Sequence, residues 1–96
     1  MMLRETLENR FGTQLADAVP VSGGDINVAY RLTLTDGTCV FMKANRAASP
    51  AFFQAEANGL AAIRDTGAIS VPEVIAAGSD EGYGSFLLLE WIEAAP

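Results

Sequence analysis

The 96-residue sequence has no histidine, a single cysteine, Cys39, and a single lysine, Lys43. One cysteine excludes an internal disulfide and a cysteine metal cluster. Without histidine the chain lacks the commonest metal ligand and general base, and with it any Ser-His or Cys-His nucleophilic site. The formal net charge is −6 and no basic residues cluster, which argues against nucleic acid or an anionic membrane as a partner.

Long apolar runs are also missing, and none approaches the length of a membrane span. The N-terminus is charged within its first five residues and then amphipathic, so it does not read as a signal peptide. Half of the residues are hydrophobic, which argues against disorder. We therefore expect one reduced, cytoplasmic domain.

The first half of the chain predicts a helix followed by strands. Apolar residues recur every four positions over 3–18, which is helical spacing, although Gly12 weakens this helix. A strict alternation of apolar and polar residues over 26–34 predicts a strand, and Asp36-Gly37 predicts a hairpin turn into a return strand over 38–44. Val19–Ser22 would form a further short strand leading into the turn at Gly23-Gly24.

The second half predicts one helix and two strands. Ser49 and Pro50 suit the N-cap and first position of a helix that runs to Asp65, with Gly67 as its C-terminal cap. Phe53, Leu60 and Ile63 are its expected core positions. Strands follow over 74–77, ended by Gly78, and over 85–92, with a turn at 80–82. The fold class is α+β: a five-stranded, mostly antiparallel sheet with one packed helix and an extra N-terminal helix.

Lys43 ends a run that reads as a buried strand, and Glu56 interrupts the apolar stripe of the following helix. A charged side chain in an apolar setting is costly unless it is paired. We therefore expect a Lys43–Glu56 ion pair, with the two groups about 3–4 Å apart. The alternative is that Lys43 extends to solvent from an edge strand and that the two residues are unrelated.

A further segment has the character of a nucleotide site. Glycines at 23 and 24, between two strands, let backbone amides approach an anion, although most such segments are only turns. The segment is neither a Walker A loop nor a dinucleotide-binding fingerprint, because a strand follows it. Glycine-rich hairpin, strand lysine and helix glutamate is the order found in a protein-kinase amino-terminal lobe.

These segments together resemble the fructosamine kinase (ketosamine-3-kinase) family over nearly the whole chain. The resemblance is carried by Val21-Ser22-Gly23-Gly24-Asp25-Ile26-Asn27-Val28-Ala29-Tyr30-Arg31-Leu32, Phe41-Met42-Lys43, Phe53-Gln54-Ala55-Glu56-Ala57-Asn58-Gly59-Leu60, Val71-Pro72-Glu73-Val74 and Phe86-Leu87-Leu88-Leu89-Glu90-Trp91-Ile92. It implies a protein-kinase-like amino-terminal lobe over residues 1–96 and transfer of the ATP γ-phosphate to a sugar hydroxyl of a glycated amine or protein.

The resemblance also implies roles for individual residues. Lys43 would contact the ATP α- and β-phosphates, oriented by Glu56, and Leu89 would take the gatekeeper position. The remaining ATP-binding residues would be Ser22, Gly23, Gly24, Asp25, Ile26 and Asn27 around the phosphates, Ala29 and Phe41 above the adenine, and the backbone of Glu90 and Ile92 at its edge. Cys39 lies on a strand rather than in the glycine loop, so the redox regulation of some members is not implied.

The same resemblance places the catalytic acid and the magnesium ligands in a carboxy-terminal lobe, with a His-Gly-Asp loop that these 96 residues lack. We read the chain as an ATP-binding lobe, expressed as a fragment or truncated in its gene, that binds no metal and has no kinase activity alone. An exposed apolar face around Phe41, Leu89, Trp91 and Ile92 would favour self-association.

Two alternatives stay open. Another small-molecule kinase, acting on aminoglycosides or choline, would share the lobe, because the acceptor is recognised mainly outside it. A non-enzymatic α+β interaction module would have no use for a Lys43–Glu56 pair.

Overall fold

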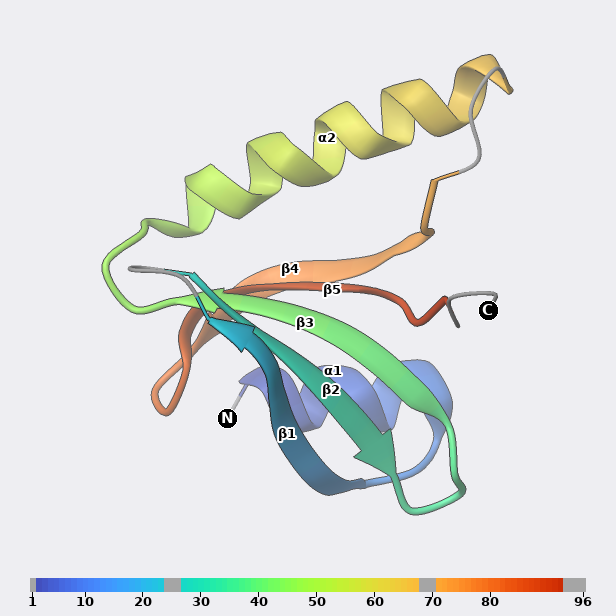
Figure 1. The fold of residues 1–96 in the computed structure, drawn as a ribbon, viewed down its shortest axis with the longest axis vertical. Helices are drawn as coiled ribbons and strands as arrows, with labels where there is room; N and C mark the ends of the chain where they lie inside the picture. Colours follow the sequence, from blue (N-terminus) through green and yellow to red (C-terminus); the bar gives the residue numbers. More distant parts are fainter. Residues whose placement is uncertain (1, 24–26, 68–70, 93–96) are drawn as a thin grey trace.

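A computed structural model describes residues 2–23, 27–67 and 71–92 of the chain. It contains two helices and five strands (Figure 1). Their order along the chain is α1 (Met2–Phe11), β1 (Leu15–Gly23), β2 (Val28–Leu34), β3 (Cys39–Asn45), α2 (Pro50–Thr66), β4 (Val74–Asp80) and β5 (Gly84–Glu90).

The five strands form one sheet in the order β1-β2-β3-β5-β4. Every neighbouring pair is antiparallel, which confirms the predicted α+β class and makes the sheet more uniform than the sequence suggested. β5 lies between β3 and β4, and its two faces pack into different hydrophobic clusters, with Phe86 and Leu88 on the side of α1 and Leu87 and Leu89 on the side of α2. This explains why residues 85–89 form an unbroken buried run, mostly apolar, rather than an alternating one.

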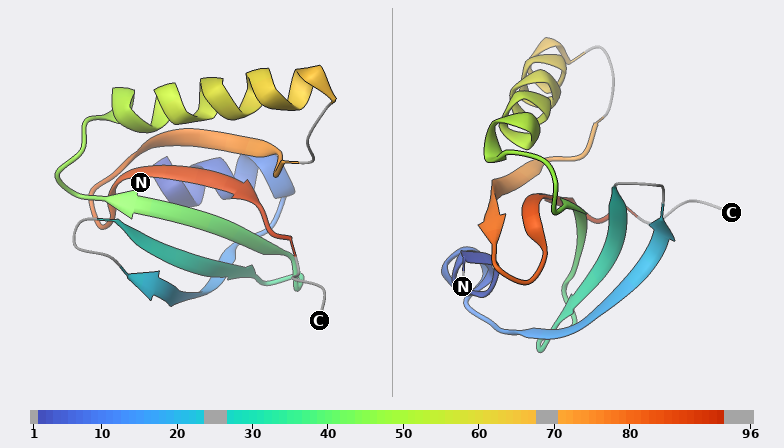
Figure 2. Two further views of the ribbon diagram at one scale, coloured as in Figure 1. Left: turned by 45° about the horizontal axis from the view of Figure 1, so that its top comes forward. Right: turned by 90° about the vertical axis from the view of Figure 1, so that its left-hand side faces the viewer.

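Two hydrophobic clusters lie on opposite faces of the sheet, because successive strand side chains point to opposite sides. One face of β3 places Val40, Met42 and Ala44 against α1, whose Leu3 and Leu7 are fully buried. The other face belongs to α2, whose Phe53 and Ala57 pack on Leu87 and Leu89 of β5. Figure 2 shows the two helices on either side of the β4–β5 part of the sheet.

The predicted N-terminal helix is present, but its predicted span of 3–18 is too long. α1 ends at Phe11, and Gly12 follows with φ +70°, a left-handed conformation that stops the helix. The chain then turns, and Leu15 starts β1 opposite Leu34 of β2. The four-residue spacing of apolar residues continues past Gly12 only because Leu15 also packs against the core.

The second helix matches its predicted bounds within a residue. Pro50 is at its start, and Gly67 caps its end with φ +69° and an amide that bonds to the carbonyl of Arg64. Ser49 is the N-cap residue as predicted, although its side chain makes no capping bond. Phe53 is buried as predicted, but Ile63 is 42% exposed, because the last turns of α2 extend past the sheet.

The later strand boundaries differ from those predicted. β4 runs through Gly78 to Asp80, and the turn is shifted to 81–83. The glycine at 78 lies inside the strand, where it leaves room for the ring of Phe86 on β5. β5 ends at Glu90, so Trp91 and Ile92 lie beyond the sheet. The hairpin at Asp36-Gly37 is confirmed, and the Thr38 amide bonded to the Asp36 carboxylate lowers the pKa of Asp36.

Neither of the two described helices is long and apolar enough to cross a membrane.

Candidate active site

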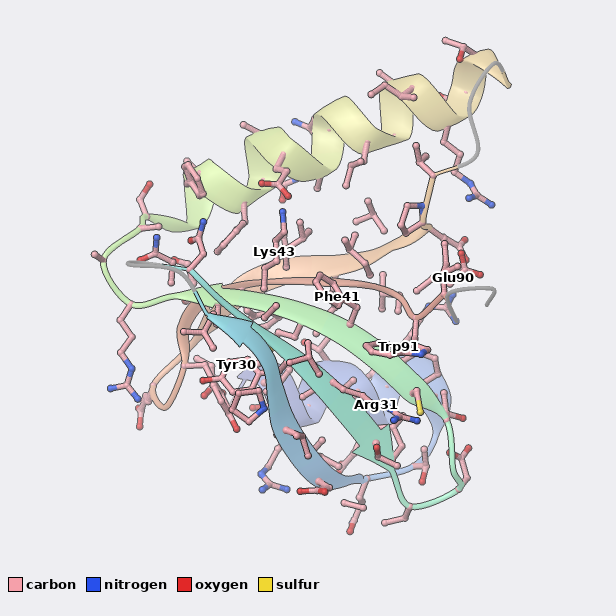
Figure 3. The ribbon with its side chains drawn as sticks, viewed as in Figure 1. Tyr30, Arg31, Phe41, Lys43, Glu90 and Trp91 are labelled. Atoms are coloured by element: carbon pink, nitrogen blue, oxygen red, sulfur yellow. The ribbon has the colours of Figure 1, made fainter. Side chains whose placement is uncertain are left out.

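The candidate site begins with four side chains that share one face of the sheet. Ala29 of β2 is paired in register with Lys43 of β3, and Phe41 of β3 is paired with Leu89 of β5. Residues two apart on a strand point to the same side, so Phe41 and Lys43 both face the side of the sheet that carries α2. Figure 3 shows these two side chains projecting from β3 toward α2. Strand pairing and side-chain alternation thus bring residues that are far apart in the sequence onto one face of the sheet.

Lys43 and Glu56 form the ion pair that their positions predicted. The Lys43 Nζ atom lies 2.8 Å from Glu56 Oε2 on the second turn of α2. This distance is that of a charge-assisted hydrogen bond, in which the carboxylate fixes where the ammonium group sits. The interaction-module alternative, in which the two residues are unrelated, does not account for this contact.

The setting of the pair differs from the one expected. The side chains of Lys43 and Glu56 are 36% and 32% exposed, so neither is enclosed in the core. Around the axis of α2, Glu56 lies at the margin of the buried stripe, next to the buried side chains of Phe53 and Ala57 and not between them. A partly exposed pair contributes little to stability, about 1 kcal/mol or less. The ammonium therefore remains accessible to a ligand on this face.

An apolar pocket of about 280 Å³ opens farther along the same face, at the end of β5. Its walls include Phe41, Leu89 and Glu90, and the chain beyond β5 closes it with Trp91 and Ile92. Pro72, before β4, forms another part of the wall. Four of the predicted ATP-binding residues, Phe41, Leu89, Glu90 and Ile92, are thus brought together. Leu89 is only 6% exposed, which corrects the expectation that it would be part of an exposed apolar surface.

Two residues beside this pocket had no predicted role in binding. The guanidinium carbon of Arg31 lies 5.2 Å from the centre of the Trp91 ring, and Phe41 is on the other side of that ring system at 6.3 Å (Figure 3). The indole Nε1 of Trp91 is buried and makes no hydrogen bond within the described ranges. Period-two alternation from Ala29 could have placed Arg31 on this face, whereas the position of Trp91 depends on how β5 ends.

The predicted phosphate-binding segment is only partly described. Ser22 and Gly23 end β1, paired with Ala29 and Val28 of β2. Gly24, Asp25 and Ile26 lie outside the described residues. Asn27 is the first described residue after them, and its side-chain oxygen accepts a hydrogen bond from Asn45 Nδ2 at 3.0 Å. Asn27, which follows these residues, thus lies beside the end of β3 that carries Lys43.

No metal centre is formed by the residues that the structure describes: no three histidine, cysteine or acidic side chains lie close enough to share an ion. A magnesium ion accompanying a nucleotide would therefore need other ligands besides these residues and the phosphates.

Comparison with known proteins places these features in a family. The fructosamine kinase family model matches residues 1–96. The chain is 40% identical over 81 residues to protein-ribulosamine 3-kinase of Arabidopsis thaliana, covering 84% of this chain and 24% of that protein. It is 49% identical over 74 residues to a Synechocystis protein assigned as a ketoamine kinase, covering 76% of this chain and 24% of that protein.

Solved structures agree. A Haemophilus somnus protein assigned as a fructosamine-3-kinase superposes with a TM-score of 0.85 at 28% identity, covering 98% of this chain and 32% of that one. The corresponding protein of Thermobifida fusca gives a TM-score of 0.67, also at 28% identity and with the same coverage. The chain thus spans about a quarter to a third of the proteins that it matches. On the match over its entire length, together with these relatives, the chain belongs to the fructosamine kinase family.

Proposed function

We propose that this chain is the ATP-binding lobe of a kinase that phosphorylates a sugar hydroxyl of glycated amines. The observation that carries the proposal is the Lys43–Glu56 contact of 2.8 Å on the face that also holds the apolar pocket. A cation held by a carboxylate, on the same face of the sheet as an apolar pocket, suits a ligand with a flat apolar base and a negatively charged tail. ATP has this character.

In this proposal Lys43 binds the α- and β-phosphates, and Glu56 keeps the ammonium from rotating away from them. Only a placed cation is needed, because phosphoryl transfer depends mainly on positioning and electrostatic stabilisation. Backbone amides of the segment 23–27 would supply further donors to the phosphates. The partial exposure of Lys43 supports this role, since a fully enclosed ammonium could not reach a phosphate oxygen.

The adenine would enter the pocket beneath Ala29 and Phe41, with Leu89 as gatekeeper at its inner wall. The Glu90 carbonyl and the Ile92 amide would bind the edge of the base. The Glu90 amide donates to the Glu73 carbonyl at 2.9 Å, so the end of β5 is anchored to the residue that precedes β4. This anchoring supports a fixed position for the backbone that would meet the base.

The substrate that accepts the phosphate is proposed from the names of the matched relatives. The matched relatives are named for ribulosamine and ketoamine, which are sugars attached to an amine. In the reaction a hydroxyl oxygen of the sugar would bond to the γ-phosphorus as the bond from that phosphorus to ADP breaks. The groups that take up the hydroxyl proton and hold magnesium would belong to the carboxy-terminal lobe implied by the family. An aminoglycoside or choline kinase would use this lobe in the same way.

We expect the 96-residue chain to bind ATP without transferring its phosphate. Trp91 is the only tryptophan and lines the pocket, so its fluorescence should change as ATP is added. The second measurement is phosphate transfer from ATP to a fructosamine. Measurable turnover by the purified chain would contradict the expected inactivity, whereas no binding of ATP would contradict the proposed function itself.

We also expect the isolated chain to self-associate. Ile92 is 55% exposed beside the pocket, and Phe52 is 49% exposed on α2. Exposed apolar side chains at an uncovered face favour association between copies. Light scattering at tens of micromolar should give a dimer or a larger species. A monomer at that concentration would contradict the expected self-association.

A further inference from the structure

Asn45, the last residue of β3, is a buried polar residue that follows Lys43 by two positions. It is 5% exposed, and burial of an amide is costly unless its hydrogen bonds are made. Its Nδ2 donates to Asn27 Oδ1 at 3.0 Å. Its Oδ1 accepts from the amides of Ala47 at 2.8 Å and Ala48 at 3.2 Å. Both the nitrogen and the oxygen of the side chain therefore hold other segments.

These bonds reach the segments that build the proposed site. Asn27 leads into β2, whose Ala29 is paired with Lys43. Ala47 and Ala48 belong to the loop between β3 and α2, and α2 carries Glu56. The same loop is held from β5, because Ser85 Oγ, opposite Asn45 in the sheet, donates to the Ala48 carbonyl at 2.6 Å.

We propose that Asn45 is a positioning residue for phosphate binding. It fixes the start of β2, the end of β3 and the approach to α2 relative to one another, and so sets where the Lys43 ammonium stands with respect to Asn27. An amide suits this position because it offers a donor and an acceptor at once, which neither a carboxylate nor a hydrocarbon does. The inference depends on the proposed function, since it assigns Lys43 to the phosphates.

The test compares a ligand that has phosphates with one that has none. Asn45→Ala should weaken ATP binding about tenfold while changing adenosine binding less than about twofold, with both dissociation constants taken from Trp91 fluorescence. A general loss of structure would weaken both ligands together. Equal losses for ATP and adenosine, or no loss for either, would overturn the inference.

The control is Asp80→Ala. Asp80 is 6% exposed and its carboxylate accepts from the amides of Leu3 and Gly82, so it resembles Asn45 in burial and in the bonds that it makes. Its partners lie in α1 and the β4–β5 turn. We expect lower stability with an unchanged ratio of ATP to adenosine affinity. A changed ratio in this variant would overturn the inference, because any buried hydrogen-bonding residue would then have the same effect.

A second variant serves if Asn45→Ala does not fold. Asn27 is exposed, and Asn27→Ala removes only the tie to Asn45 Nδ2 while leaving the bonds to Ala47 and Ala48. It should lower ATP affinity without lowering adenosine affinity, a result that needs no other variant. Where Asn45→Ala does fold, combining the two substitutions should add little. Additive losses would show that the two residues act separately and would overturn the inference. Failure of the unaltered chain to bind ATP would refute the proposed function as well, whereas normal ATP binding with an unchanged ratio in both variants refutes the inference alone.

Discussion

Lys43→Met should weaken the binding of ATP about ten- to a hundredfold, the size expected for losing hydrogen bonds to a charged group. Adenosine binding should hardly change, because the pocket that would take the base is lined by Phe41, Leu89 and the residues after β5. Methionine keeps most of the length of the side chain and removes its charge. Titration of Trp91 fluorescence with each ligand measures both effects.

The controls separate the loss of the ammonium from loss of charge or of stability. Arg64→Ala removes the same charge from α2, where the guanidinium bonds to the Val71 carbonyl, and should leave ATP binding unchanged. Glu56→Gln should give a smaller loss than Lys43→Met, because it removes the orienting charge and keeps the ammonium. Unfolding free energies should differ by less than about 1 kcal/mol, as the Lys43–Glu56 pair is partly exposed. Unaltered ATP affinity in Lys43→Met would refute the phosphate role.

Gly84→Ala should be among the most destabilising single substitutions in this chain, lowering the free energy of unfolding by about 3–5 kcal/mol. Gly84 starts β5 with φ +82°, and a Cβ atom there would stand 2.5 Å from the Arg46 Cα and 2.9 Å from the Asn45 carbonyl oxygen. The neighbours are backbone atoms, which cannot rotate away. Chemical unfolding followed by circular dichroism gives the free energy.

Gly37→Ala is the matched comparison for this substitution. Gly37 has φ +92° in the hairpin turn, but its Cβ position has no atom within 4 Å. Only the conformational strain of a left-handed alanine remains, about 1–2 kcal/mol. The difference between the two variants isolates the steric contact. Equal destabilisation would mean that the strand start and the loop after β3 separate easily, which would also weaken the case for Asn45 as a fixed positioning residue.

Strand patterns in this chain were predictable where one face of a strand is buried and the other is not. The alternation before Leu34 and the turn at Asp36-Gly37 predicted the β2–β3 hairpin correctly, and Pro50 and Gly67 predicted the limits of α2. The boundary of α1 failed because apolar residues at helical spacing continued into a strand. Gly12 was the informative signal, since a left-handed residue stops a helix where hydrophobic spacing does not.

The candidate site was predictable to a similar extent. Lys43 and Glu56 could be paired from the sequence because each is a charge amid apolar positions, one on a strand and one on the helix that follows it. Their exposure could not be predicted, because it depends on how far α2 stands from β3. Neither could the position of Arg31 over Trp91, which requires β5 to end at Glu90 and the chain beyond it to turn back toward β2.

The sequence by itself determined the elements and the charges that matter: period-two strands, a capped helix, one lysine and no histidine. Those features are local, since they depend on side-chain spacing and backbone preference over a few residues. Only the tertiary structure decided that β5 lies between β3 and β4, that Leu89 is enclosed while Lys43 stays accessible, and that Asn45 joins three segments. These depend on packing between residues far apart in the chain, and that packing is set by which faces exclude water together rather than by any single stretch of sequence.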